Sequence, residues 1–169
     1  GVHSLITDTH VTPANVHDSG PYLDRIDRMR TRFGFEIGAV GLDAGYFTPH
    51  ICKGLVERNI YGVIGYRRPN HKEGFFYKRE YEYDAKADVY RCPNAQLLAY
   101  STTNRLGYRE YKSDAKQCSD CPSRAQCTAS KNHVKVVTRH VWQHFKEQLN
   151  ANRLSVSGKE IYKHRKETV

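Results

Sequence analysis

Ala39-Val40-Gly41-Leu42-Asp43-Ala44-Gly45-Tyr46-Phe47-Thr48-Pro49 leads from an apolar segment to a helix start, with one carboxylate between them. Residues 36–42 are typical of a short buried strand. Thr48 followed by Pro49 is typical of a helix N-cap with proline at the first helical position. Asp43 is therefore expected in a strand-to-helix turn, where open α/β sheets place ligand and catalytic sites. The alternative is a plain turn, because turn chemistry alone favours Asp and Gly.

The segments on either side of this turn predict an α/β fold. Residues 3–11 alternate as a strand does, with Asp8 as an exposed strand residue, and a helix opening at residues 19–21 should run to Phe33 and stop at Gly34. A second helix is expected over 48–59, followed by a strand over 60–66. This β-α-β-α-β order favours α/β architecture with part of the sheet parallel.

The charge of the chain indicates a nucleic-acid partner. Lys and Arg total 27 against 18 acidic residues, a net charge of +9, and no apolar run approaches the ~20 residues of a membrane helix. No secretion signal is visible, so a cytoplasmic, nucleoid-associated protein is expected. Residues 1–68 carry 8 basic and 7 acidic side chains, whereas residues 69–169 carry 19 and 11. Such an excess suits phosphate backbones, although a merely basic soluble protein is the alternative.

Residues 69–152 are interpreted as a β-rich insertion. Short strands are expected over 75–83, 89–92, 96–102, 108–112 and 134–140, and a helix over 141–152. The aromatic side chains of 75–83 either form one face of a hairpin or stack on bases. Lys78, Arg79 and Arg109 are the basic residues of the insertion that we expect to contact DNA.

Four of the five cysteines lie in this insertion, at Cys92, Cys118, Cys121 and Cys127, and their pattern is C-x25-C-x2-C-x5-C. A C-x2-C pair can direct two thiolates to one metal, and two further cysteines complete a four-thiolate site. The spacing predicts a structural metal, either zinc or a 4Fe-4S cluster. Unligated or redox-active thiols are the alternative, and Cys52 is expected to be a buried small hydrophobic residue.

The chain ends on a predicted helix. Ser157-Gly158-Lys159-Glu160 is typical of a capping box, in which the serine bonds the amide three residues on. The helix is expected to run from there to the last residue.

Three stretches resemble DDE transposases of bacterial insertion sequences: Thr12-Pro13-Ala14-Asn15-Val16-His17-Asp18-Ser19, Leu42-Asp43-Ala44-Gly45-Tyr46, and Tyr162-Lys163-His164-Arg165-Lys166-Glu167-Thr168-Val169. The cysteine-bearing middle looks like the insertion of the branch whose last helix carries a Tyr/Arg/Glu/Lys signature. The resemblance implies a ribonuclease H-like mixed sheet with flanking helices and three carboxylates around Mg²⁺ or Mn²⁺. Asp43 corresponds to the second carboxylate, and Tyr162 and Arg165 to residues directed to phosphate.

The same resemblance implies that the family's first Asp precedes this sequence and that its Glu follows it. The chain is accordingly interpreted as an internal piece of a transposase catalytic domain, inactive alone. Residues 1–68 would be part of the core, 69–152 the four-cysteine insertion, and 153–169 the start of the final catalytic helix. The intact protein is expected to cleave and join DNA at element ends and target as a homo-oligomer. The alternatives are a non-catalytic nucleic-acid-binding module with a structural metal, and a nuclease without strand transfer.

Overall fold

The computed structural model describes residues 5–168 and divides into two compact units. Unit 1 contains the described residues up to Arg68 and from Trp142 onward, and unit 2 is Pro69–Val141. Unit 2 is thus inserted into unit 1 along the sequence. The boundary at residue 68 coincides with the expected one, whereas residues 142–152, expected in the insertion, belong to unit 1.

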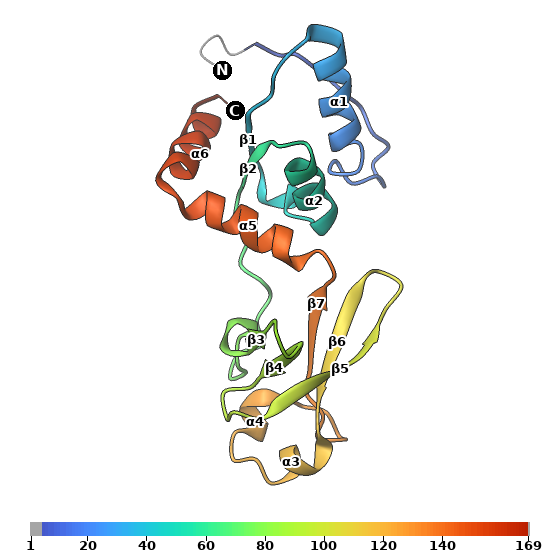
Figure 1. The fold of residues 1–169 in the computed structure, drawn as a ribbon, viewed down its shortest axis with the longest axis vertical. Coiled ribbons are helices and arrows are strands. Elements are labelled where there is room, and N and C mark those ends of the chain that lie inside the picture. Colours follow the sequence, from blue (N-terminus) through green and yellow to red (C-terminus); the bar gives the residue numbers. More distant parts are fainter. Residues whose placement is uncertain (1–4, 169) are drawn as a thin grey trace. The chain divides into compact units, whose positions relative to one another are not determined.

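Unit 1 is built on a β-α-β element (Figure 1). Its elements are α1 (Tyr22–Phe33), β1 (Ala39–Leu42), the 3-10 helix η1 (Ala44–Tyr46), α2 (Pro49–Glu57), β2 (Tyr61–Ile64), α5 (Gln143–Leu154) and α6 (Val156–Thr168). β1 and β2 pair in parallel, with Ala39 opposite Tyr61 and Leu42 opposite Ile64. The expected parallel pairing is therefore confirmed, and the fold class is α/β.

The strand expected over 3–11 is wrong for its described part, since residues 5–11 have no regular secondary structure. Residues 3 and 4 lie outside the described residues. Leu5, Ile6 and Val11 are 77%, 83% and 92% exposed. An alternating segment forms a strand only when it pairs with another strand, and within residues 5–168 the sheet of unit 1 consists of β1 and β2 alone. A complete ribonuclease H-like sheet therefore stays a prediction.

The core of unit 1 lies between the helices and the parallel strands. Thr48 Oγ1 accepts a hydrogen bond from the Ile51 amide at 3.2 Å, with Pro49 in the first turn, so α2 begins as predicted. α1 ends as predicted at Gly34, which adopts a left-handed conformation. Helix α5 adds Leu149 to the buried cluster. Its other members are Leu23, Ile26, Ile51, Cys52, Leu55, Ile60 and Ile64.

Helix α6 begins earlier than the capping pattern predicted. Ser155, between α5 and α6, accepts a hydrogen bond from the Gly158 amide on its Oγ at 2.9 Å. Ser155 therefore caps α6, and the assignment of this role to Ser157 is wrong. Ser155 and Ser157 are both candidates for this cap. Because α5 ends at Leu154, Ser155 is the first residue after it and takes the capping position.

Unit 2 is an antiparallel sheet with two short helices (Figure 1). The strands β3 (Glu82–Asp84), β4 (Val89–Arg91), β5 (Leu97–Thr103), β6 (Tyr108–Ser113) and β7 (Val136–His140) are hydrogen-bonded in that order. The helices α3 (Ala115–Ser119) and α4 (Arg124–Cys127) lie between β6 and β7 along the chain. Of the strand expected over 75–83, only the end forms, as the start of β3. Residues 78–80 instead form the 3-10 helix η2 (Lys78–Glu80), where the Glu80 carboxylate accepts a hydrogen bond from the Tyr77 amide at 2.5 Å.

The core of unit 2 is rich in tyrosine. Its buried members are Tyr81, Tyr90, Leu98, Tyr111 and Val137. Tyrosine hydroxyls away from water need hydrogen-bond partners, and Asp88 accepts one hydrogen bond from the partly buried Tyr83 and one from the buried Tyr111, each at 2.7 Å. Burial opposes ionisation of Asp88, but these bonds and the Arg109 guanidinium hold the pKa of its carboxyl below the ordinary value.

None of the helices described in residues 5–168 combines the length and apolar character required to cross a bilayer.

Candidate functional site

Asp43 lies where the sequence predicted it, directly after β1. It occupies the N-cap position of η1 with extended backbone, and its side chain is 62% exposed. Its backbone carbonyl accepts from the Tyr46 amide at 3.0 Å, which fixes the turn. The carboxylate is therefore presented at the carboxyl end of a parallel strand, the place where α/β sheets carry their chemistry.

The final helix reaches this carboxylate. Arg165 Nη2 of α6 lies 2.6 Å from Asp43 Oδ1, and the Arg165 side chain is only 17% exposed. The Arg165 guanidinium also lies 5.7 Å from the centre of the Tyr162 ring, one turn earlier. The structure thus gathers Asp43, Tyr162 and Arg165, three residues that the sequence analysis selected from two distant motifs.

Two glycines allow α6 to come this close. A β-carbon at Gly65, after β2, would lie 2.5 Å from the Tyr162 hydroxyl and 3.0 Å from the Ala44 amide nitrogen. A β-carbon at Gly41, within β1, would lie 3.3 Å from Cβ of Arg165. Gly41 and Gly65 therefore form a notch for α6, and the sequence analysis missed this role. Their positions at the ends of the two predicted strands were the available signal; β1, expected to be buried, is only partly buried, whereas most of β2 is buried.

The upstream motif also lies near Asp43. Burial raises the pKa of the Tyr46 hydroxyl, and the negative charges of Asp18 and Asp43 raise it further. His17 Cε1 is 3.9 Å from the place of a β-carbon on Gly45, and His17 Nδ1 lies 2.7 Å from Ser19 Oγ. The segment 12–19 therefore lies beside the turn 42–46 that contains Asp43.

A carboxylate oxygen is a ligand type that Mg²⁺ prefers, so Asp43 can serve as one ligand. Within residues 5–168, however, no three His, Cys, Asp or Glu side chains are arranged to hold a metal ion. The chemistry of Asp43 fits one ligand of a divalent site, and further oxygen ligands would be needed to complete it.

The three basic residues expected to contact DNA have different surroundings. Lys78 and Arg79 are exposed on η2, where the Lys78 ammonium donates to the Thr138 carbonyl at 2.5 Å and Arg79 lies over the Tyr77 ring. Arg109, on β6, pairs with Asp88 at 2.5 Å and lies over the Tyr100 ring at 4.6 Å. Arg109 therefore contributes to the packing of the sheet, whereas Arg79 presents its charge to solvent.

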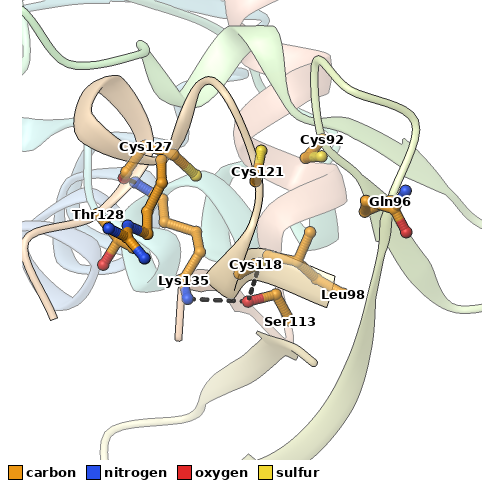
Figure 2. A pocket seen from close by; sticks show the side chains of 10 residues that line it. Cys92, Gln96, Leu98, Ser113, Cys118, Cys121, Cys127, Thr128 and Lys135 are labelled. Carbon is orange, nitrogen blue, oxygen red and sulfur yellow. Dashed lines mark hydrogen bonds between the residues drawn. The ribbon is translucent and has the colours of Figure 1, made fainter. Parts of the chain in front are cut away.

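The four cysteines of the predicted metal site line one small pocket in unit 2 (Figure 2). Cys92 follows β4, Cys118 lies in α3, Cys121 lies in the turn after α3, and Cys127 ends α4. The cavity between them has a volume of about 20 Å³. The structure therefore brings together four thiols from segments that are as many as 35 positions apart (Cys92 to Cys127).

Three of the four sulfurs have polar neighbours outside the cysteine set. Cys118 Sγ lies 3.2 Å from Ser113 Oγ, Cys121 Sγ accepts from Asn94 Nδ2 at 3.1 Å, and Cys127 Sγ lies 3.1 Å from the Tyr81 hydroxyl. Burial raises the pKa of the Cys127 thiol, and the nearby Cys118 and Cys92 act in the same direction.

The sulfurs do not stand in ligand geometry, because the described residues contain no group of three arranged for a metal ion. The structure therefore shows the β-rich unit and its gathered thiols, and the metal staple stays a prediction. Ser113, Asn94 and Tyr81 were missed as neighbours of the sulfurs, since nothing in the cysteine spacing identifies them.

Comparison with known proteins finds one family that is similar to the second part of the chain. The model of the transposase DDE domain matches residues 91–169, a segment that includes the four cysteines, Tyr162 and Arg165 but not Asp43. No curated protein and no solved structure matches the chain. Residues 91–169, somewhat less than half of the chain, are thus similar to the transposase DDE domain, in agreement with the resemblance seen in the motifs.

Proposed function

We propose that this chain supplies part of a transposase catalytic domain that cleaves DNA and transfers strands with divalent metal. The observation that carries the proposal is the Asp43–Arg165 contact at 2.6 Å. It joins a carboxylate at the end of a parallel strand to a basic residue of the family-matched helix. The complete domain would have the ribonuclease H-like sheet that the resemblance implies.

Asp43 is proposed as a catalytic carboxylate and a ligand of Mg²⁺ or Mn²⁺. Its exposed side chain and turn position suit this role. When bound, divalent ions activate a water or 3′ hydroxyl and stabilise the leaving oxygen. Arg165 would bind a DNA phosphate through its planar, bidentate guanidinium, with the Tyr162 ring supporting it. In the structure the Arg165 guanidinium is paired with the Asp43 carboxylate. A DNA phosphate would therefore compete with Asp43 for the N–H donors of Arg165.

DNA contacts outside this site are proposed for unit 2. Residues 69–141 carry 13 basic and 8 acidic side chains, so unit 2 holds +5 of the net charge of +9. Lys78 and Arg79 lie on η2, and Arg109 lies on β6. Element ends and target DNA would be the partners, bound by a homo-oligomer. The gathered thiols support a structural metal in this unit, zinc or a 4Fe-4S cluster, that stabilises a fold with a small core.

The test uses the protein translated from the whole reading frame that contains these 169 residues, with DNA from the flanks of that frame. We expect Mg²⁺- or Mn²⁺-dependent nicking and joining, abolished in Asp43→Asn while DNA binding and the thermal unfolding curve are retained. Glu36→Gln, which removes an exposed carboxylate just before β1, is the control and should stay active. Full activity of Asp43→Asn would refute the assignment.

The same assay separates the alternatives. Cleavage without any joined product would favour a nuclease on this fold. DNA binding without cleavage in either variant would favour a binding module.

A further inference from the structure

We propose that the thiol pocket of unit 2, formed by Cys92, Cys118, Cys121 and Cys127, binds a single thiophilic divalent cation of the zinc type. This inference rests on the structural-metal role proposed above, but not on catalysis, and it decides between one ion and a cluster. The four side chains come from three separate parts of unit 2 and surround one cavity (Figure 2). One metal ion bound by all four cysteines would therefore cross-link the end of β4 to the α3–α4 region.

The size of the cavity favours one ion. Its volume of about 20 Å³ compares with the roughly 10–15 Å³ that one water needs by the same kind of measure. A single cation with short bonds to sulfur, about 2.3 Å for zinc, fits a space of that order. A cubane of four irons and four sulfides is several times larger and would require the surrounding strands and turns to separate.

The atoms around the sulfurs suit bound thiolates. Asn94 Nδ2 donates to Cys121 Sγ at 3.1 Å, and the Tyr81 hydroxyl lies 3.1 Å from Cys127 Sγ. Donors of this kind stabilise negative sulfur and orient metal ligands. Four thiolates around a divalent ion carry a net charge of −2. Two cationic residues, Arg124 and Lys135, line the same pocket and offset that charge.

The backbone near the cysteines supports convergence without a large change of fold. The Ala95 amide donates to the Cys92 carbonyl at 2.8 Å, and the Arg124 amide donates to the Cys121 carbonyl at 3.1 Å, so both cysteines open tight turns. Because the sulfurs are not yet in ligand geometry, binding requires side-chain rotations about χ1. It also requires loss of the thiol protons, since thiolates are the ligands, so the Cys118 thiol gives up its hydrogen bond to Ser113 Oγ.

The experiment titrates the purified 169-residue chain, freed of metal under reducing conditions, with Co²⁺ as a spectroscopic probe and then with Zn²⁺. We expect one equivalent of Co²⁺ to give sulfur-to-cobalt charge-transfer bands and tetrahedral d–d bands, both removed by one equivalent of Zn²⁺. Cys92→Ser and Cys121→Ser should weaken Co²⁺ binding or change these bands. Cys52→Ser, at the fifth cysteine, in the core of unit 1, should leave both unchanged.

Two further measurements keep the proposal testable if a cysteine variant fails to fold. Asn94→Ala should lower the Zn²⁺ affinity by about 10–100-fold while keeping all four thiols. In the unmodified chain, Zn²⁺ should protect Cys92, Cys118, Cys121 and Cys127 from alkylation, mapped by mass spectrometry.

Three results would overturn the proposal. They are Co²⁺ bands that persist in Cys92→Ser and Cys121→Ser alike, purified protein that is brown with iron and sulfide, and thiols whose alkylation is the same with and without Zn²⁺. None of these results bears on Asp43, so a failure here is distinguishable from a failure of the catalytic assignment.

Discussion

The guanidinium of Arg165 in α6 lies 2.6 Å from the Asp43 carboxylate. The contact joins two parts of unit 1, of which only one is matched by the family model. Arg165 lies in the matched segment 91–169, and Asp43 lies outside it. The contact therefore places Asp43, which the turn position and the motif resemblance had selected, next to the segment that the family model matches. It also explains why a largely exposed carboxylate keeps a defined position.

The first prediction is that Arg165→Gln impairs DNA cleavage much more than it impairs folding. Because Asp43 is 62% exposed, loss of the ion pair should cost at most about 1 kcal/mol of unfolding free energy. Cleavage by the reading-frame protein should fall by about 10²-fold, the usual effect of losing one donor to a reacting phosphate or oxyanion. Single-turnover cleavage and chemical denaturation provide the two measurements. Lys163→Gln, on the exposed side of the same helix, is the control, and equal effects of the two substitutions would contradict the assignment.

The second prediction concerns the glycine notch. Gly65→Ala should destabilise unit 1 by about 1–3 kcal/mol, because its β-carbon meets the Tyr162 hydroxyl and the Ala44 amide. Gly38→Ala, with no neighbour within 4 Å of the added carbon, should change stability by no more than about 0.5 kcal/mol. Fluorescence of Trp142, the one tryptophan of the chain, reports unfolding of unit 1.

Tyr162→Phe removes the atom nearest to the added carbon, so it should recover part of the stability lost in Gly65→Ala. If Gly65→Ala were as stable as Gly38→Ala, the close packing of α6 against β2 would be refuted.

The sequence predicted those elements whose signals are local. Thr48 and Pro49 start α2 and Gly34 ends α1 because capping depends on a few neighbouring atoms. The turn position of Asp43 and the gathering of the four cysteines on one pocket were likewise accessible from strand ends and spacing.

Features that depend on residues far apart in the chain could not be predicted from the sequence. Residues 5–11 alternate as a strand does but have no strand to pair with among the described residues, so the pattern misled. The notch at Gly41 and Gly65 needs knowledge of where α6 docks. The role of Asp88 depends on three side chains from β3 and β6, which spacing along the chain does not bring together.

The third prediction is a pH dependence of unit 2 that originates at Asp88. The folded state holds the pKa of this carboxyl below its ordinary value, so it binds protons less readily than the unfolded chain does. The stabilisation is therefore complete above the unfolded pKa of about 3.9 and is lost as the pH falls through the lower folded-state value. Asp88→Asn should cost about 1–3 kcal/mol at pH 7 and should flatten the acid side of the stability curve. Near-ultraviolet circular dichroism of the tyrosines, recorded between pH 7 and pH 2, checks this.

Asp120→Asn, an exposed carboxylate after α3, is the matched control and should retain the acid dependence of the unmodified chain. An unchanged acid profile in Asp88→Asn would show that the Tyr83–Asp88–Tyr111 hydrogen bonds do not govern the stability of unit 2.

The last prediction separates a DNA-contacting arginine from a structural one. Arg79 is exposed on η2, so Arg79→Gln should weaken binding to all DNA sequences alike and reduce the slope of log K against log salt by about 1, while unit 2 stays equally stable. Arg109 pairs with Asp88, so Arg109→Gln should lower the unfolding temperature of unit 2, and any loss of DNA affinity should accompany that destabilisation. Lys86→Gln, which removes an exposed charge in the β3–β4 turn, controls for net charge. Fluorescence anisotropy across a salt series measures the slopes, and identical slopes for Arg79→Gln and Lys86→Gln would remove Arg79 from the DNA-binding surface.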